Sequence, residues 1–437
     1  MIFKKKNKRA LVITGLGPIC STGIGKKHFW QGILNRKTNI VERSYFFKKH
    51  TKNKFFVHEV RDFSIKDFNI DRNKLNELYA WRDKNELSKD VSYLLASIQL
   101  AIQDGDLSYK KDKNNIGLVV FHENLGLGPF YDEIVKLIRE NQKLFSNKNF
   151  QDSDIVPLIY FGLKKSGYNL QNFVSLHEIA RIFNLHGFTL FINNACCSGL
   201  YALEVAADII RSGKSKSVLI AGSDSGDIYK HLWFNDLGLY SPDGVIRPFA
   251  ENRNGFIFGE SGGAMLMEDY EHAKQRGANI YAEYCGGSFL SESWKINHPA
   301  IAENYYSQVI EGALQRSKIK VSDIDLICPH GTGTIVFDIY EAMNIKKVFG
   351  EKFPKPYITA LKPYFGHCLG NSAFLESIAA LLVLKNNVIP PTLNIPENDD
   401  TFGLRVIRDK VPTNINYVIK TCSAFAGFDG AVIFKKV

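Results

Sequence analysis

The sequence of 437 residues lacks the features that would place it in a membrane or in a disulfide- or zinc-stabilised class. No stretch approaches the roughly 20 consecutive apolar residues that a membrane-spanning helix needs, so no membrane partner is expected. No Cys-x-x-Cys pair occurs, and the seven cysteines are odd in number. Both facts argue against a zinc ribbon and against a disulfide framework. Reduced thiols are typical of a cytoplasmic protein, which is the location that we predict.

Two further patterns, one of glycines and one of basic residues, only partly match the binding motifs that they suggest. Gly15 and Gly17 begin the glycine fingerprint of dinucleotide-binding folds, but Cys20 stands where a third glycine is needed. The net charge is +10, yet the basic residues form no single block. Those at positions 48–54 lie among phenylalanines without a nucleic-acid motif, so we expect a solvated loop there and no nucleic-acid partner. The basic residues at positions 4–9 are expected to form a solvated tail before the first strand.

Short apolar runs alternate with segments of helical periodicity along the chain, and 45% of the residues are apolar. This alternation predicts an α/β protein with largely buried sheets. The predicted strands are 11–14, 116–121, 189–192, 217–222, 264–268, 280–284, 325–328, 415–422 and 431–434. The predicted helices are 86–104, 129–142, 174–184, 197–212, 302–316, 336–348 and 371–385.

Two of these helices, within 197–211 and 373–384, are apolar on nearly every face. A helix of this kind is covered by protein on both sides. Each follows a strand and a tight glycine-containing turn, which predicts two similar halves that face one another. No low-complexity linker separates the halves, and we expect the boundary to be covered by packing. The predicted halves are residues 1–258 and 259–437.

The first motif that could take part in a reaction is Asn194-Ala195-Cys196-Cys197-Ser198-Gly199, between a predicted strand and a buried helix. A cysteine at a helix N-terminus meets the positive end of the helix dipole, which lowers the pKa of its thiol. The backbone N–H groups there can also bind a developing oxyanion. The alternative is a small buried side chain without chemistry, which is the usual place of a lone cysteine.

Two histidine motifs follow in the second predicted half. Pro329-His330-Gly331-Thr332-Gly333-Thr334 comes directly after a strand, where ligand sites of α/β proteins usually lie. Lys362-Pro363-Tyr364-Phe365-Gly366-His367 places a lysine and a second histidine just before the second buried helix. Taken singly, each histidine could be no more than a residue of a turn.

Together and in this order, the cysteine, the HGTGT segment and the K-x-x-x-x-H segment resemble the β-ketoacyl synthase family. The resemblance is to its condensing enzymes that elongate acyl chains on a carrier protein, and it spans nearly the whole chain. It is also carried by residues 11–17, 30–34, 247–249, 253–260 and 425–427. It implies the thiolase fold, in which two similar halves stack as a five-layer α-β-α-β-α sandwich, with no cofactor and no metal.

The resemblance also implies residue roles. Cys196 would carry the acyl group as a thioester, and its backbone N–H would form an oxyanion hole with that of Phe425, which also gates the pocket. His330 and His367 would assist decarboxylation of the malonyl extender. Lys362 would support the site electrostatically, paired with Glu376. The remaining supporting residues that match the family are Thr332, Thr334, Asp338 and Glu341.

The implied partners are an acyl carrier protein and a second subunit, either identical or a chain-length-factor-like paralogue. The chain departs from the family at Asn194, Cys197 and Ala250, and the loop around Phe425 is poorer in glycine. Phe428 after that loop resembles the ketosynthases of type II polyketide assembly, so we favour the unlike pair. The chief alternative is a non-catalytic chain-length factor, a class that usually lacks the nucleophile. A biosynthetic thiolase is a further alternative because Cys422 lies near the C-terminus.

Overall fold

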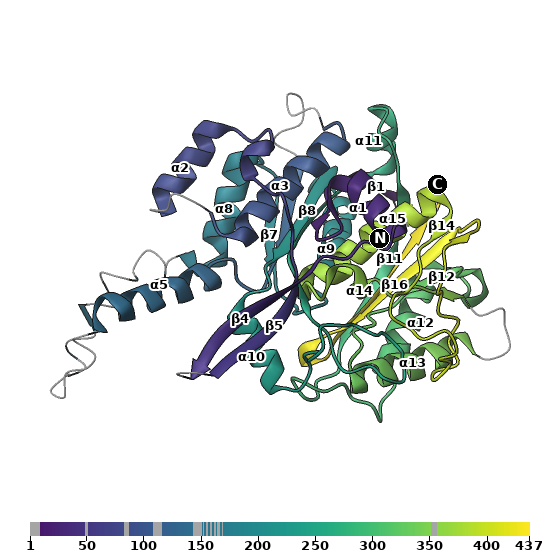
Figure 1. Cartoon of the computed structure of the whole chain (residues 1–437). Helices are drawn as coiled ribbons and strands as arrows, with labels where there is room; N and C mark the ends of the chain where they lie inside the picture. The colour runs from purple at the N-terminus through teal and green to yellow at the C-terminus, as the bar shows by residue number, and fades with distance from the viewer. Residues whose placement is uncertain are drawn as a thin grey trace.

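The computed structural model describes residues 9–48, 51–82, 87–107, 116–142, 169–350 and 356–437, and a few single positions between 151 and 167 (Figure 1). The basic segment expected to form a tail falls almost wholly outside the described residues. Over the part of the chain that is described, no helix is both long and apolar enough to cross a bilayer.

Ten strands of the main sheet form two sets of five with the same connectivity. The first set is β1 (Leu11–Leu16), β6 (Ile116–Phe121), β7 (Thr189–Ile192), β8 (Ser217–Asp224) and β10 (Ser261–Asp269). The second set is β11 (Ala282–Ser291), β12 (Leu326–Cys328), β13 (Tyr357–Ile358), β16 (Tyr417–Ser423) and β17 (Phe428–Lys435). The order across the sheet is β7-β6-β8-β10-β1 followed by β11-β17-β16-β12-β13.

Strand direction repeats as well as strand order. In each set the first strand pairs antiparallel with the last, the last pairs antiparallel with the fourth, and the remaining two pairings are parallel. A short antiparallel pairing of β1 with β11 joins the sets. The expectation of two similar halves is therefore visible in the topology. The repeat favours a division between β10 and β11, and the boundary at residues 258 and 259 stays a prediction.

Two buried helices separate the halves. α9 (Ser198–Arg211) packs against β6, β8 and β10 of one half and β11 and β17 of the other. α15 (Ser372–Asn386) packs against α9 and against strands of both halves, and its residues 372–384 are all buried. Figure 1 shows both helices at the centre of the molecule. The prediction that these two helices are covered on both sides is confirmed.

Outer helices complete the layers. α3 (Lys89–Asp104) covers β1, β8 and β10, while α8 (Asn172–Phe183) packs on β7. On the opposite side α12 (Tyr305–Ser317) covers β11 and β17, and α13 (Ile335–Phe349) packs on α12. The sequence of layers is thus α-β-α-β-α, as expected. Successive side chains of a strand point to opposite faces of the sheet and so contribute to two different layers of the core. In β6, Leu118 and Val120 face the outer core, whereas Val119 and Phe121 face the inner one.

Most predicted elements are present with shifted ends, and one region differs in kind. β4 (Ile40–Lys48) and β5 (Thr51–His58) pair as an antiparallel hairpin where we expected a solvated loop. Phe55 is buried, and Val57 of β5 pairs with Phe258 of β9 (Phe258–Gly259). The hairpin forms because this tertiary contact buries apolar side chains that the local sequence pattern does not single out.

The other described elements connect this framework. They are β2 (Ile19–Cys20), β3 (Gly23–Ile24), α1 (Gly25–Leu34), η1 (Ile65–Asp67), α2 (Arg72–Arg82), α5 (Leu127–Glu140), α10 (Ile228–Asp236), α11 (Tyr270–Gln275), η3 (Val321–Asp323), α14 (Lys362–Phe365), η4 (Leu369–Asn371), β14 (Val388–Ile389), β15 (Val411–Pro412) and η5 (Phe425–Gly427).

Candidate active site

Cys196 lies in the tight turn between β7 and α9. Ala195, just before it, has a left-handed backbone with φ of 50°, a conformation that residues other than glycine seldom adopt. The Ser198 hydroxyl holds this turn: it accepts a hydrogen bond from the Asn194 N–H and donates one to the Ala195 carbonyl, both at 2.7 Å. The turn places Cys196 two residues before the first residue of α9, with Cys197 as the N-cap.

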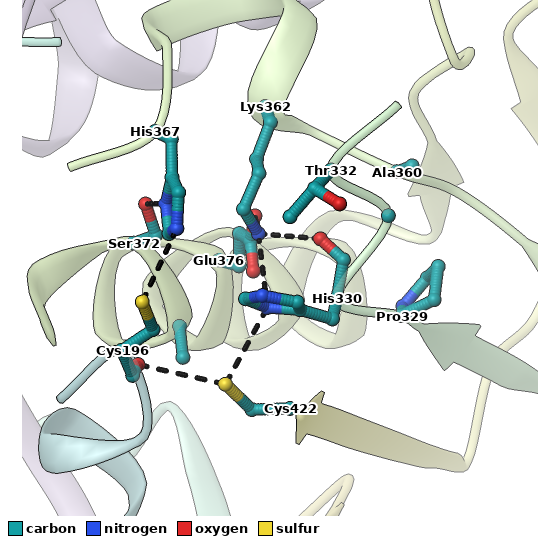
Figure 2. A network of polar contacts seen from close by, with 12 residues as sticks. Cys196, Pro329, His330, Thr332, Ala360, Lys362, His367, Ser372, Glu376 and Cys422 are labelled. Carbon is teal, nitrogen blue, oxygen red and sulfur yellow. Dashed lines mark hydrogen bonds and ion pairs between the residues drawn. The ribbon is translucent and has the colours of Figure 1, made fainter. Parts of the chain in front are cut away.

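The close approach of the two buried helices brings Cys196 to the second half of the chain. A Cβ atom on Gly199 would lie 2.7 Å from the Cβ of Phe374, so only glycine allows α9 to lie this near to α15. As a result the Cys196 Sγ lies 3.3 Å from the His367 Nε2 (Figure 2).

His367 is oriented through its other ring nitrogen. Its Nδ1 lies 3.0 Å from the Ser372 Oγ, which also accepts a hydrogen bond from the Cys368 N–H at 2.6 Å. The Phe256 ring contacts the imidazole edge-on, with centroids 4.8 Å apart. The imidazole is therefore held on two sides, with Nε2 facing the thiol. Ser372 was not among the residues predicted for the site.

His330 follows β12, and its loop is fixed by carboxylates from α13. The backbone N–H groups of His330 and Gly331 donate to the two carboxylate oxygens of Glu341, each at 2.7 Å. Asp338 accepts hydrogen bonds from the Gly333 N–H at 3.1 Å and the Phe249 N–H at 2.7 Å. Both acids are buried. They are placed to hold the loop rather than to face the thiol.

The two threonines of the same loop complete its internal hydrogen bonds. The hydroxyls of Thr332 and Thr334 lie 2.9 Å apart, and Thr332 donates to Asp338 at 3.3 Å. Thr334 is the N-cap of α13. The His330 and His367 rings are nearly perpendicular, with centroids 5.5 Å apart, so the two imidazoles border one small volume next to the thiol.

A buried ionic cluster lies behind His330. The Lys362 ammonium donates to the Glu376 Oε1 at 2.9 Å and to the His330 carbonyl, and it lies 3.4 Å from the His330 Nδ1. Lys420, which was not predicted, lies 2.5 Å from the other oxygen of Glu376 and is fully buried. A single carboxylate therefore bridges two ammonium groups.

Burial governs the proton equilibria of the site. Desolvation, reinforced by the nearby Lys362 and Lys420 ammonium groups, lowers the pKa of His330 and of His367 well below the ordinary histidine value. Both imidazoles are therefore neutral at physiological pH. Desolvation also raises the pKa of the Cys196 thiol well above its ordinary value. This direction is opposite to the lowered thiol pKa expected from the helix terminus, and its largest cause is desolvation by burial.

Phe425 is the first residue of η5. It stacks on Phe234 of α10 at 5.1 Å between centroids and meets Trp233 edge-on at 5.9 Å. The backbone N–H groups of the residues on either side of Phe425 already have acceptors. The Ala424 N–H donates to the Phe428 carbonyl, and the Ala426 N–H donates to the Ile296 carbonyl. Ala426 has a φ of 60° and Gly427 a φ of 67°, so an alanine shares the left-handed turn of this loop with the glycine.

Cys422 is the third residue that the sequence prediction did not assign to the site. Its Sγ lies 3.4 Å from the His330 Nδ1 and 3.5 Å from the Cys196 carbonyl oxygen (Figure 2). The structure thus brings together Cys196, His330 and His367, with Lys362 and Glu376 behind them. All seven cysteines are free thiols. Among the described residues, no group of three or more His, Cys, Asp or Glu side chains is placed to hold a metal ion.

Comparison with protein families gives two matches that together cover most of the chain. The family model described as "Beta-ketoacyl synthase, N-terminal domain" matches residues 8–273. The model described as "Beta-ketoacyl synthase, C-terminal domain" matches residues 281–396.

Three curated proteins align with this chain over nearly their whole length. The 3-oxoacyl-[acyl-carrier-protein] synthase 2 of Vibrio harveyi is 25% identical, with 99% of each chain covered. Nodulation protein E of Rhizobium meliloti is 28% identical, over 98% of this chain and 100% of that protein. The oxytetracycline polyketide putative beta-ketoacyl synthase 1 of Streptomyces rimosus is 25% identical, with 98% of each chain covered.

Solved structures share the fold. A chain of the ishigamide ketosynthase/chain length factor superposes with a TM-score of 0.82 at 24% identity, covering 99% of this chain and all of the other. A chain from a type II polyketide synthase ketosynthase in complex with its acyl-carrier protein gives 0.81 at 23% identity, over 99% of this chain and 100% of that one. These ketosynthases have the thiolase-like fold that the layers and strand order of this chain reproduce.

Proposed function

Because the chain belongs to the β-ketoacyl synthase family of condensing acyltransferases, we propose that it joins an acyl unit to a malonyl unit through a Cys196 thioester. The observation that carries the proposal is the 3.3 Å contact between the Cys196 Sγ and the His367 Nε2, with His330 beside them. A thiol, a base and a second imidazole are the groups that decarboxylative condensation requires.

The first step is acyl transfer to the enzyme. His367 accepts the Cys196 proton through Nε2, the thiolate attacks the thioester carbonyl of the donor, and the proton then passes to the departing carrier thiolate. The N–H groups of Cys196 and Phe425 bind the oxyanion. The raised pKa of the Cys196 thiol makes this neutral base necessary, because little thiolate exists beforehand.

The second step is condensation. The neutral imidazoles of His330 and His367, the latter now as the tautomer with its proton on Nε2, donate hydrogen bonds to the malonyl thioester oxygen as negative charge develops on it. The bond from the malonyl carbon to its carboxylate breaks, carbon dioxide leaves, and the electron pair forms an enolate. The enolate carbon attacks the Cys196 thioester, a carbon–carbon bond forms, and the Cys196 thiolate leaves and takes up a proton from water, since its first proton left with the carrier thiol.

We place this chemistry in type II polyketide or fatty acid synthesis, with an acyl carrier protein as the donor of both substrates. The net charge of +10 suits an acidic carrier, and such an encounter weakens as salt rises. The exposed side chain that contacts Phe425 is Trp233, which we propose as an apolar part of the docking surface. A cytoplasmic location stays a prediction.

We further propose a dimer through the free edge of β7. In the described part of the chain this strand pairs with β6 alone, and Thr189 and Leu190 on it are exposed. An exposed strand edge presents unpaired backbone groups that a second subunit can cover. Expression of the chain alone separates the like from the unlike pair: an active homodimer that makes long chains unaided would defeat the unlike pair that we favour.

Mass spectrometry of the acylated enzyme tests the proposed function and the chain-length-factor alternative together. After incubation with acyl carrier protein, the thioester is expected on Cys196, to persist in Cys197→Ala and to be absent from Cys196→Ala. Adjacent residues at a helix start point about 100° apart, so only one of the two thiols can serve. A thioester on Cys197, or none on the wild-type chain, contradicts the assignment.

A further inference from the structure

We propose that Lys420 is a positioning residue of this site: its ammonium group, acting with Lys362 through Glu376, holds the backbone segment that presents His330. This inference rests on the proposed condensing function. It concerns a residue that none of the three sequence motifs contains. The contacts that carry it come from four elements of the second half.

Strand register brings Lys420 to the site. Side chains two residues apart share one face of a strand, so Lys420 and Cys422 of β16 point the same way. On the neighbouring strand, β12, Cys328 is the register partner of Lys420, and Pro329 and His330 come next. The Lys420 ammonium reaches this segment, donating to the Pro329 carbonyl at 2.8 Å and to the Thr421 carbonyl at 2.9 Å.

The two lysines bind successive backbone carbonyl groups of this segment. Lys420 binds the carbonyl of Pro329 and Lys362 binds the carbonyl of His330, while each ammonium takes one oxygen of Glu376. On the other side Glu341 binds the N–H groups of His330 and Gly331. Four consecutive backbone groups are thus held by buried charges, which fixes the position from which the His330 side chain enters the site. Figure 2 shows the Lys362 contacts of this arrangement.

The cost of burying Lys420 supports a specific role. Lys420 is fully buried, and removing an ammonium group from water costs several kcal/mol. An apolar side chain at this strand position would fill the core without that cost. Burial alone lowers the pKa of Lys420, but the Glu376 carboxylate outweighs it and raises the pKa, so the ammonium stays charged.

Lys420 also bears on the protonation of the imidazoles. The titratable groups around the two rings are Lys362 from α14, Glu376 from α15, Glu341 from α13, Cys196 before α9, and Lys420 and Cys422 from β16. Removal of one of the two cations lets the pKa of both histidines rise. The histidines then gain protons at a higher pH, so the acid limb of the condensation rate moves to higher pH.

The test compares Lys420→Met with Lys435→Met, a control on β17 whose lysine is half-exposed and pairs with Glu283 at 3.6 Å. Three quantities are measured: acylation of Cys196 by mass spectrometry, release of carbon dioxide from malonyl carrier protein, and the pH dependence of that release. Lys420→Met is expected to load normally, to release carbon dioxide about 10-fold or more slowly, and to shift the acid limb upward. A misplaced catalytic group costs up to about 10²-fold.

The outcomes separate the two proposals. A wild-type chain that neither loads nor releases carbon dioxide overturns the proposed function itself. An active wild type with Lys420→Met indistinguishable from Lys435→Met in rate and pH profile overturns the role of Lys420 alone. If Lys420→Met does not fold, Lys420→Gln, which removes the charge and keeps a donor, is expected to show the same upward shift. An unshifted limb in that variant also overturns the role.

Discussion

The Glu376 carboxylate, which bridges two buried ammonium groups, is expected to contribute strongly to the free energy of unfolding. Glu376→Gln preserves the shape of the side chain but leaves the ammonium groups of Lys362 and Lys420 facing one another without a counter-charge. Removal of one partner from a buried ion pair costs about 3–5 kcal/mol. No cavity is created, so the whole effect is electrostatic.

The corresponding shift in Tm follows from the chain length. Unfolding entropy of about 2.1 cal/mol/K per residue gives roughly 0.9 kcal/mol/K for 437 residues. Glu376→Gln should therefore lower Tm by about 3–5 °C. Lys420→Met, by contrast, leaves a balanced pair of Lys362 and Glu376 at 2.9 Å. It should lower Tm by less than Glu376→Gln does, because Glu376 and Lys362 still neutralise one another, although the Pro329 and Thr421 carbonyls lose a donor.

Thermal unfolding followed by circular dichroism, at one protein concentration and near neutral pH, measures both variants. A triple variant, Lys362→Met with Lys420→Met and Glu376→Leu, removes the whole cluster and should recover most of the stability that Glu376→Gln loses, yet release no carbon dioxide from malonyl carrier protein. The reasoning fails if Glu376→Gln melts within 1 °C of the wild type. It also fails if Lys420→Met loses as much as Glu376→Gln.

Other expectations concern the chemistry. His330→Ala and His367→Ala should each slow malonyl decarboxylation by on the order of 10², while His330→Ala still loads Cys196; equal retention of both steps would exclude the assigned role. Because burial raises the pKa of Cys196, its alkylation by iodoacetamide should still accelerate as pH rises past 9, and a plateau at neutral pH would show a stabilised thiolate. Phe425→Ala, which removes the stack on Phe234, should alter loading or chain length; an unchanged product profile would argue against gating.

The sequence predicted a strand well where a short apolar run marks the strand. It predicted poorly where a contact with a distant part of the chain determines whether the strand forms. The bounds of β6 and β7 match because apolar runs between turns specify strands directly. The β4–β5 hairpin was missed because it packs on segments far away in the sequence, among them β9, some 200 residues away, and His231 of α10, which stacks on Phe55. The direction of the Cys196 pKa was misjudged for a similar reason: the helix terminus can be read from the local sequence, whereas the burial of the thiol depends on the complete fold.

The candidate site shows the same division. Cys196, His330, Lys362 and His367 lie in compact motifs that can be recognised from neighbouring residues alone. Lys420 and Cys422 lie in a largely apolar strand. Their place in the site depends on the pairing of this strand with β12, about 90 residues earlier in the chain. A charged residue inside an otherwise apolar strand is a signal that sequence reasoning could have used, since such a residue is seldom buried without a partner.

The mirrored strand order also sets the moment at which the protein becomes chemically competent during its synthesis. The thiol belongs to the strands that leave the ribosome first, whereas both imidazoles and both lysines belong to those that leave last. A nascent chain that ends near β10 holds the cysteine but no base, and α9 still lacks its cover from α15. Such a chain cannot carry out the proposed condensation, because it contains neither His330 nor His367.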